Sequence, residues 1–361
     1  MLSSTAWPAS ARDVDTTDID RTAGRTGSAP QDRLAFARWL ASTAPLLSAG
    51  SAGGAFAALA AVAARDVALA RTVEPHLDAL GILEQAGVPA PPGSTWGVFA
   101  AEAPGTVLTA TPDPDAGPDA FRLAGTKPWC SLASSLSHAL ITAHVGDGRQ
   151  LFAVDLDQDG VTVHDGAWVA RGMPDVPSGP VDLDGVRATP VGAPGWYLTR
   201  PGFAWGGIGV AACWWGGAVG LARVLRRTAA AHPESELLQA ALGATVLDLA
   251  DAEDALATAA ARIDTPLPVD SGPGDGDPRD GASDGSTDWR LIAQVTRSRV
   301  RRAVDAVLHG VVATIGPGPL TSDPAVAARV ADLGLYVLQD HGERDLARVG
   351  RIVTERGGVA W

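Results

Sequence analysis

The chain has 361 residues and a mass of 36.8 kDa, and its 46% hydrophobic and 19% charged residues supply enough apolar material for a substantial core. Acidic residues outnumber basic ones by 41 to 28, and this net charge of −13 excludes nucleic acid as a bulk partner, because phosphate binding needs a basic face. The two cysteines, Cys130 and Cys213, exclude a disulfide framework and a cysteine-based zinc site, and they predict a reducing, cytoplasmic location.

The N-terminal third of the sequence divides into a polar segment and a helical one. Residues 1–30 are polar and lack the apolar core of a secretory signal, so we predict a disordered lead-in there. From residue 31 apolar residues recur at a helical period, with an alanine-rich stretch over 55–70. Gly87 and three following prolines are stop signals. This pattern predicts an N-terminal helical domain over residues 31–95.

Residues 96–197 change to a pattern typical of strands. The segments 139–145, 151–156 and 160–164 are short and alternating, and clusters of glycine and aspartate separate them. Strands at this spacing, with no long helical segments between them, favour antiparallel pairing. We therefore predict a central antiparallel β domain, built as a sandwich or a barrel.

Residues 198–361 predict a C-terminal four-helix bundle. The helical segments cover 204–231, 236–263, 288–315 and 323–353, and Asp323 followed by Pro324 is a typical start for the last one. The link over 265–287 is rich in glycine, proline, serine and aspartate and predicts a mobile loop. Its acidic residues lack the ligand spacing of a calcium-binding loop, so no metal site is expected.

The first of these helices also has the length and composition of a membrane span. Residues 201–222 contain no charged side chain over about 22 residues, which is long enough to cross a bilayer. However, the segment contains seven glycines, and a strongly amphipathic helical region follows it. A buried, closely packed helix is the interpretation we favour, and no membrane partner is expected.

Widespread catalytic motifs do not account for this sequence. It contains no Gly-x-Ser-x-Gly elbow and no phosphate-binding loop ending in Gly-Lys-Ser or Gly-Lys-Thr. The segment 207–212 matches a dinucleotide fingerprint only superficially, because no apolar strand precedes it. The histidines form no His-x-x-x-His pair, so no metal site is expected from them either.

A set of motifs in the middle of the chain resembles the acyl-CoA dehydrogenase family. GTKPWCS at 125–131 resembles the family segment G-x-K-x-W-I-T, and FAAEAPG at 99–105 is similar to its T-E-P-x-x-G-S strand end. WVARGMPDVPS at 168–178 and VDLDGV at 181–186 resemble the hairpin and strand that follow in the family. The resemblance covers residues 31–361. It implies an α+β fold, mostly α, with helices, a β domain and a four-helix bundle in that order.

The same resemblance implies FAD as the cofactor. Trp129 would pack along the isoalloxazine ring, Ser131 would replace a threonine near its N5 atom, and the backbone around Ala101 and Glu102 would address its pyrimidine edge. A tryptophan at a strand end and a serine in a turn are the purely structural alternatives. Lys127, the only lysine of the chain, precedes a proline, and we expect it to point to solvent.

Arginines on the third helix of the bundle are further cofactor candidates. Arg297 and Arg299, with Arg301 and Arg302 beside them, include at least one that could reach the FAD pyrophosphate, or they form a solvated stripe. In the family fold the bundle buries one face against another copy. The resemblance thus implies a homodimer or a homotetramer.

The catalytic base is harder to place. Dehydrogenation of an acyl-CoA needs a carboxylate that removes the α-proton. In the family this carboxylate is often a glutamate eight residues after an Arg-Asp pair. Here Ala331 and Asp332 stand in the place of that pair, Asp340 lies eight residues later, and Glu343 is one turn further on. Solvated carboxylates are the alternative for both, and residues 204–222 offer no other base.

The resemblance implies a flavin-dependent oxidoreductase, most simply an FAD acyl-CoA dehydrogenase acting on a CH–CH bond. Its substrate would be a small molecule such as an acyl thioester, with an electron acceptor that the sequence does not name. The missing family glutamate leaves two alternatives open. One is a flavin-dependent monooxygenase on the same fold, and the other is a catalytically inactive paralogue that serves as a binding or scaffold protein.

Overall fold

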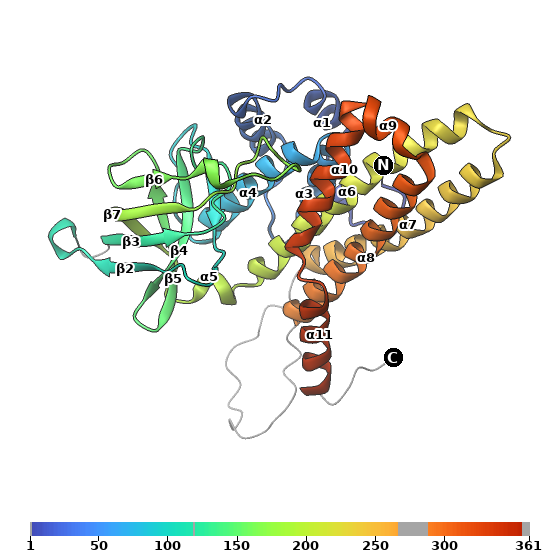
Figure 1. Cartoon of the computed structure of the whole chain (residues 1–361). Coiled ribbons are helices and arrows are strands. Elements are labelled where there is room, and N and C mark those ends of the chain that lie inside the picture. Colours follow the sequence, from blue (N-terminus) through green and yellow to red (C-terminus); the bar gives the residue numbers. More distant parts are fainter. Residues whose placement is uncertain (1, 118–119, 266–287, 356–361) are drawn as a thin grey trace, which may run out of the picture.

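The computed structural model describes residues 2–117, 120–265 and 288–355, with helices from both ends of the chain packed beside a β domain (Figure 1). The N-terminal part holds η1 (Ala9–Arg12), α1 (Thr16–Ala23), α2 (Pro30–Thr43), α3 (Ala52–Arg65) and α4 (Val67–Gln85). Asp66 separates α3 from α4 and caps α4 by accepting the Leu69 N–H at 2.8 Å. The predicted alanine-rich stretch therefore spans two helices.

The prediction of a disordered lead-in over residues 1–30 is wrong. Trp7 and Ile19 are buried, and the segment is tied to the far helix α7 (Glu236–Asp264). The buried Glu253 carboxylate of α7 accepts the Ser4 N–H at 3.0 Å and the Trp7 indole N–H at 2.9 Å. A buried carboxylate needs such donors, and only the folded chain brings these two segments together.

The middle of the chain forms the predicted, mainly antiparallel β structure. Its strands are β1 (Trp96–Phe99), β2 (Leu108–Pro112), β3 (Phe121–Lys127), β4 (His138–Val145), β5 (Gly148–Asp155), β6 (Val161–Val163) and β7 (Val181–Val191). Pairing runs from β4 through β2, β3, β7 and β5 back to β4, so five strands close a barrel. Two pairings differ from the prediction, because β1 and β2 both run parallel to β4.

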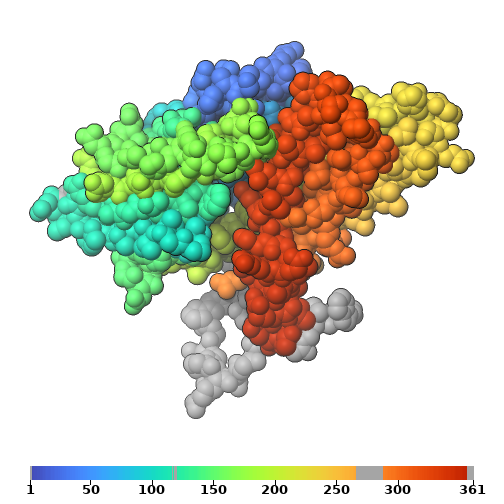
Figure 2. Space-filling model, in the orientation of Figure 1, coloured from blue at the N-terminus to red at the C-terminus, as the bar shows by residue number. Residues whose placement is uncertain are grey.

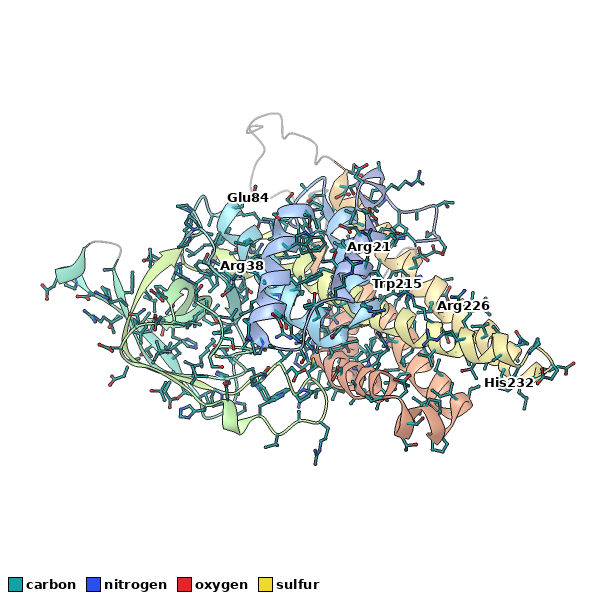
Figure 3. All side chains as sticks on the ribbon, turned by 90° about the horizontal axis from the view of Figure 1, so that it is seen from above. Arg21, Arg38, Glu84, Trp215, Arg226 and His232 are labelled. Carbon is teal, nitrogen blue, oxygen red and sulfur yellow. The ribbon has the colours of Figure 1, made fainter. Side chains whose placement is uncertain are left out.

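The C-terminal part is helical. It contains α5 (Trp196–Thr199), α6 (Pro201–Ala231), α7, α8 (Trp289–Ile315), α9 (Pro317–Ser322), α10 (Pro324–Tyr336), η4 (Val337–Gln339) and α11 (Glu343–Glu355). Seen from above, the α6–α7 hairpin extends away from the β domain, with His232 at its tip (Figure 3). The predicted mobile loop over 265–287 lies, apart from Thr265, outside the described residues.

The prediction of one helix over residues 323–353 is wrong. Asp323 caps its start as expected, by accepting the Ala325 and Val326 N–H groups. The helix then stops at Tyr336, and a new one begins at Glu343. Gly342 between them has a φ of +56°, a conformation that an α-helix cannot contain. This break separates α10 from α11 and lets α11 turn toward a different part of the protein.

Helix α6 is the buried centre of the protein. Among the described residues it is the one helix long and apolar enough to cross a membrane, and 72% of its most apolar stretch is buried. Its glycines allow close packing, since a Cβ on Gly216 would lie 2.3 Å from the Ala60 carbonyl oxygen of α3. Trp205, Trp214 and Trp215 of this helix are buried in the core.

The β domain is joined to the bundle through the loop before β7. A Cβ on Gly172 would lie 2.2 Å from the Ala331 carbonyl oxygen, so only glycine lets the loop approach α10 this closely. The next residue, Met173, donates its N–H to the buried Asp332 carboxylate of α10. Asp332 thus holds the β domain against the bundle.

Candidate functional site

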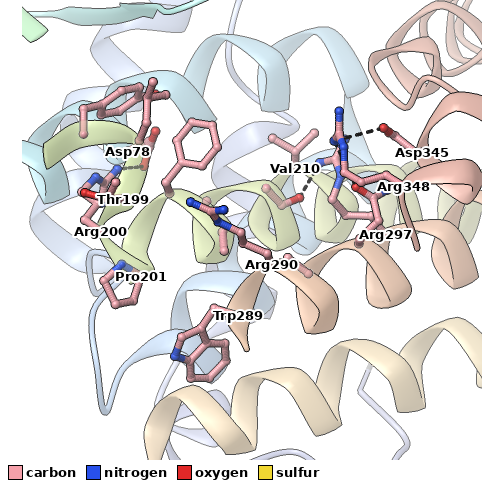
Figure 4. A pocket seen from close by; sticks show the side chains of 18 of the residues that line it. Asp78, Thr199, Arg200, Pro201, Val210, Trp289, Arg290, Arg297, Asp345 and Arg348 are labelled. Atoms are coloured by element: carbon pink, nitrogen blue, oxygen red, sulfur yellow. Dashed lines mark hydrogen bonds and ion pairs between the residues drawn. The ribbon is translucent and has the colours of Figure 1, made fainter. Parts of the chain in front are cut away.

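A cavity of about 1320 Å³ opens between α4, the starts of α6 and α8, and α11 (Figure 4). In Figure 2 the surface is hollowed between the β domain and the red C-terminal helices. The lining of the cavity combines apolar, basic and acidic side chains. They include Glu74, Asp78, Tyr197, Arg200, Phe203, Val210, Trp289, Arg290, Gln294, Arg297, His341, Asp345 and Arg348.

Small residues at the start of α6 leave room for this cavity. Gly206 and Gly207 both line it, and a Cβ on Gly207 would be 3.5 Å from the Arg297 side chain. Arg297 of α8 donates to the Gly207 carbonyl at 2.6 Å and to the Gln339 carbonyl at 3.4 Å. Its guanidinium lies 4.7 Å from the Trp214 ring centroid. Arg297 therefore connects α6, α8 and η4 at the cavity wall.

Glu74 of α4 contributes a buried carboxylate to the cavity. Its side chain is 11% exposed, and Arg71 Nη1 lies 3.7 Å from its Oε2 atom. Burial raises the pKa of Glu74 to about 7, although the positive charges of Arg71 and Arg297 lower it. The group is therefore ready to gain or lose a proton near neutral pH.

Glu74 is not among the site residues predicted from the sequence. The helical period placed α4 in the core and does not distinguish which of its charged residues face a cavity. A usable signal is present, because Arg71 and Glu74 stand three residues apart on a largely buried helix. A charged pair in such a place is costly unless it has a partner or a function.

Ion pairs stand at both ends of the cavity (Figure 4). At one end Arg200 Nη2 lies 3.9 Å from Asp78, and Arg200 Nη1 donates to the Gln85 side chain at 2.7 Å. Burial raises the pKa of Asp78, and the Arg200 charge lowers it in part. At the other end Asp345 pairs with Arg348 at 3.3 Å.

The predicted catalytic bases lie outside the cavity lining. Asp340 follows η4 and is 5% exposed; its Oδ1 accepts the Gly342 N–H at 2.8 Å, and its Oδ2 is enclosed with no hydrogen-bond partner among the described residues. Glu343 is exposed at the start of α11. The neighbours Gln339 and His341 line the cavity, whereas these two carboxylates do not.

Two predicted flavin-binding residues lie on the loop after β3. Trp129 has a φ of +60° and its side chain is 57% exposed. Ser131 is buried, and its hydroxyl accepts from Arg71 Nη2 at 3.0 Å and bonds with the Ser178 hydroxyl at 2.8 Å. Because Arg71 also pairs with Glu74, one arginine connects this loop with the cavity.

The other predicted cofactor residues are more dispersed. Ala101 and Glu102 follow β1 and are exposed, and the Glu102 carboxylate bonds to His144 at 2.9 Å and Arg149 at 3.1 Å. Arg299 is exposed on α8 and donates to the Asp251 carbonyl at 3.3 Å. Of the predicted residues, only Arg297 lines the cavity.

The expectation that Lys127 points to solvent is wrong. Its side chain is buried inside the barrel, and Nζ donates to the Thr142 carbonyl at 2.7 Å and to the Thr142 hydroxyl at 2.9 Å. Burial lowers the pKa of Lys127 to about 8. The register of β3 decides this, because Lys127 shares a face with the buried Leu123.

The sequence by itself matches no family model and no curated protein. Solved structures, however, match over almost the whole chain. Glutaryl-CoA dehydrogenase from Mycobacterium smegmatis is 16% identical with a TM-score of 0.76, covering 98% of this chain and 96% of its own. FMN-bound TdsC from Paenibacillus sp. A11-2 is 18% identical with a TM-score of 0.69, covering 94% and 95%. The chain has the acyl-CoA dehydrogenase fold.

This acyl-CoA dehydrogenase fold is also present in enzymes of other names. Nitrososynthase from Micromonospora carbonacea var. africana is 17% identical with a TM-score of 0.68, and each chain covers 93% of the other. The order of helices, β domain and helical bundle predicted from the sequence is confirmed by these matches.

Proposed function

We propose that the protein is a flavin-dependent oxidoreductase whose small-molecule substrate binds in the cavity beside Glu74. One observation supports this proposal most strongly. Within the acyl-CoA dehydrogenase fold, the cavity is lined by a buried carboxylate, that of Glu74, whose pKa is about 7. The similar structures support the cofactor class, since TdsC and KijD3 were solved with FMN and the M. smegmatis enzyme with FADH2.

The residues on the loop after β3 fit a flavin. The exposed Trp129 indole offers an aromatic face. The Ser178 hydroxyl donates to the Val176 carbonyl at 3.1 Å, so Ser131 donates to Ser178 and itself accepts from Arg71. Arg71 of α4 thus places a guanidinium beside this loop, and a flavin ring needs hydrogen-bond donors around it. When bound, a flavin supplies the two-electron chemistry that the side chains lack.

The more specific form of the proposal is an FAD acyl-CoA dehydrogenase acting on a CH–CH bond. Such a reaction needs a carboxylate that removes the proton next to the thioester carbonyl. Apolar side chains such as Phe203, Val210 and Trp289 line the cavity and suit an acyl chain. FAD is proposed because the M. smegmatis dehydrogenase structure with FADH2 aligns over 99% of this chain at a TM-score of 0.72.

A flavin-dependent monooxygenase is the second candidate. It is favoured by the position of Asp340 and Glu343 outside the cavity lining, because a monooxygenase does not need a base at that place. TdsC, described as a dibenzothiophene monooxygenase, shows that the fold accommodates this chemistry in another protein.

Flavin content and anaerobic reduction test the proposal. The purified protein should be yellow, or become so with added FAD, and an acyl-CoA should bleach the flavin without oxygen. A protein that does not bleach, yet consumes oxygen when given reduced flavin and an aromatic substrate, would support the monooxygenase. A colourless protein that added FAD or FMN does not reconstitute would contradict both, and a binding or scaffold role would remain.

A further inference from the structure

The carboxylates around the cavity differ in how firmly their neighbours hold them. Asp78 pairs with Arg200, and Asp345 accepts the His341 N–H at 3.1 Å and pairs with Arg348. Asp288 caps α8 by accepting the Leu291 N–H at 3.1 Å. Asp345 and Asp288 therefore each have a structural task as hydrogen-bond acceptors. Asp78 accepts no hydrogen bond among the described residues, and Arg200 lies 3.9 Å from it.

Glu74 is held as loosely as Asp78, but its arginine, Arg71, also donates to Ser131 on the loop after β3. Across the part of the chain that the structure describes, no hydrogen bond to its carboxylate is present, and Arg71 at 3.7 Å is its one ion-pair partner. Its place on the helix is also unusual. Pro75 follows it inside α4 and has no N–H, so the Arg71 carbonyl lacks its usual helical donor. The Glu74 carboxylate is thus a buried acidic group that faces open space and is free to exchange a proton.

We propose that Glu74 is the catalytic base of this cavity and removes the proton from the carbon next to the carbonyl of a bound acyl thioester. This inference rests on the proposed function and names the residue that acts as its base. In the step the C–H bond breaks, its electron pair stays on the substrate as an enolate, and the proton forms a new bond to a Glu74 carboxylate oxygen. The sequence candidates Asp340 and Glu343 do not take part in this step.

Arg71 is a positioning residue in this scheme. It lies between the Glu74 carboxylate and the Ser131 hydroxyl, at 3.7 and 3.0 Å, and its guanidinium is 5.9 Å from the Tyr336 ring centroid. Its fixed positive charge offsets the negative charge that passes from Glu74 to the enolate. Because Arg71 contacts both groups, it holds the base next to the loop where the flavin is proposed to bind.

The arginines of the cavity suit the charged part of a thioester carrier. Arg290 is exposed and points between the two ion pairs in Figure 4, and Arg348 is 58% exposed at the α11 end. Phosphates of the carrier are the groups that such arginines recognise. The apolar part of the ligand then contacts Phe203, Val210 and Trp289, which line the same cavity.

The pKa of Glu74, which burial raises to about 7, supports this role. A carboxylate with a raised pKa is a stronger base than an ordinary one, and near neutral pH a large fraction remains ionised.

Hydrogen exchange at the α-carbon tests the assignment without oxidation of the substrate. Phenylacetyl-CoA has α-hydrogens, but its next carbon is aromatic and cannot be dehydrogenated. The flavin-loaded wild-type protein in D₂O should exchange these hydrogens, as measured by mass spectrometry. Glu74→Gln should lower the rate about 100-fold or more, as expected for loss of a general base. Glu74→Asp, which keeps the charge but shortens the side chain, should lower it less.

A matched control is available on the same helix. Glu84 is exposed on α4 and does not line the cavity, so Glu84→Gln should exchange at the wild-type rate. Three results would overturn the proposal. They are wild-type exchange in Glu74→Gln, no exchange in the wild type, and a loss in Asp340→Asn as large as that in Glu74→Gln. If the α-hydrogens exchange but no acyl-CoA bleaches the flavin, the role of Glu74 as a base is supported and only the dehydrogenase activity is contradicted.

Discussion

Glu74 and Asp340 are both largely buried carboxylates in the helical part of the protein, but their surroundings differ. Asp340 accepts the Gly342 N–H in the turn between η4 and α11. Glu74 lies at the surface of the large cavity with Arg71 as its ion-pair partner. The pattern of residues along the chain favoured Asp340, because a counted spacing can be seen in a sequence whereas burial cannot.

The raised pKa of Glu74 predicts how stability changes with pH. In the folded protein burial favours the protonated form, so ionisation of Glu74 costs free energy. This cost is absent below the ordinary pKa of 4.5 and complete above about 7, so the contribution of Glu74 makes stability fall as the pH rises between these values. Its charged and titratable neighbours are Arg71 and Asp78 on α4, Tyr197, Cys213, Arg297 and Tyr336.

Calorimetry of Glu74→Gln measures this contribution. Glutamine has nearly the same shape and does not ionise, so the variant should gain stability relative to the wild type between pH 5 and pH 8, by up to about 3 kcal/mol. The stability of Glu84→Gln should depend on pH in the same way as that of the wild type. Equal pH dependence in Glu74→Gln and the wild type would show that Glu74 has an ordinary pKa.

At the scale of the elements, the contact between α3 and α6 organises the bundle. Both helices are rich in small residues, which lets their backbones approach closely. The tightest point is Gly216, where a Cβ would lie 2.3 Å from the Ala60 carbonyl oxygen. Other glycines of α6, Gly206 and Gly207 near its start, line the cavity, so packing and site depend on one helix.

Alanine substitutions of two helical glycines separate packing from helix propensity. Gly216→Ala should lower the free energy of unfolding by about 1–3 kcal/mol, because the backbone of α3 or α6 must move. Gly243→Ala on α7 should raise it by about 0.5–1 kcal/mol, since nothing lies within 4 Å of its Cβ and alanine favours the helix. Urea denaturation of both variants checks this, and stabilisation by Gly216→Ala would contradict the close contact.

At the scale of the whole molecule, contacts distant in sequence unite the parts of the chain. Asp332 binds the Met173 N–H, Arg71 binds Ser131, and Glu253 holds the N-terminal segment. These three contacts join the bundle to the β domain, the N-terminal helices to the β domain, and the N-terminus to α7. The cavity is likewise built from elements that are distant in the sequence, because α4, α6, α8 and α11 all contribute lining residues.

We also expect the protein to form a homodimer or a homotetramer. Large apolar side chains are exposed on α7, where Leu237 is 83%, Val246 55% and Leu247 69% exposed. Burying them against another copy would remove this apolar surface from water. Light scattering at micromolar concentration should give a mass of two or four chains, and Leu247→Glu should shift it toward the monomer. A strictly monomeric wild type would contradict the expectation.

The sequence alone determined the order of helices, β domain and bundle, because helical and strand periods are local properties of the chain. It also indicated the loop with Trp129 and Ser131 as a candidate flavin-binding segment, because the residues of that motif are adjacent in the sequence. The ordered N-terminal segment, the buried Lys127 and the carboxylate in the cavity were decided only by the tertiary structure. The first two depend on partners distant in sequence, Glu253 and Thr142, and the third depends on burial, which raises the cost of a charge. Periodicity carries neither of these, so the fold was predictable from the sequence, whereas the buried carboxylate of Glu74 in the cavity was not.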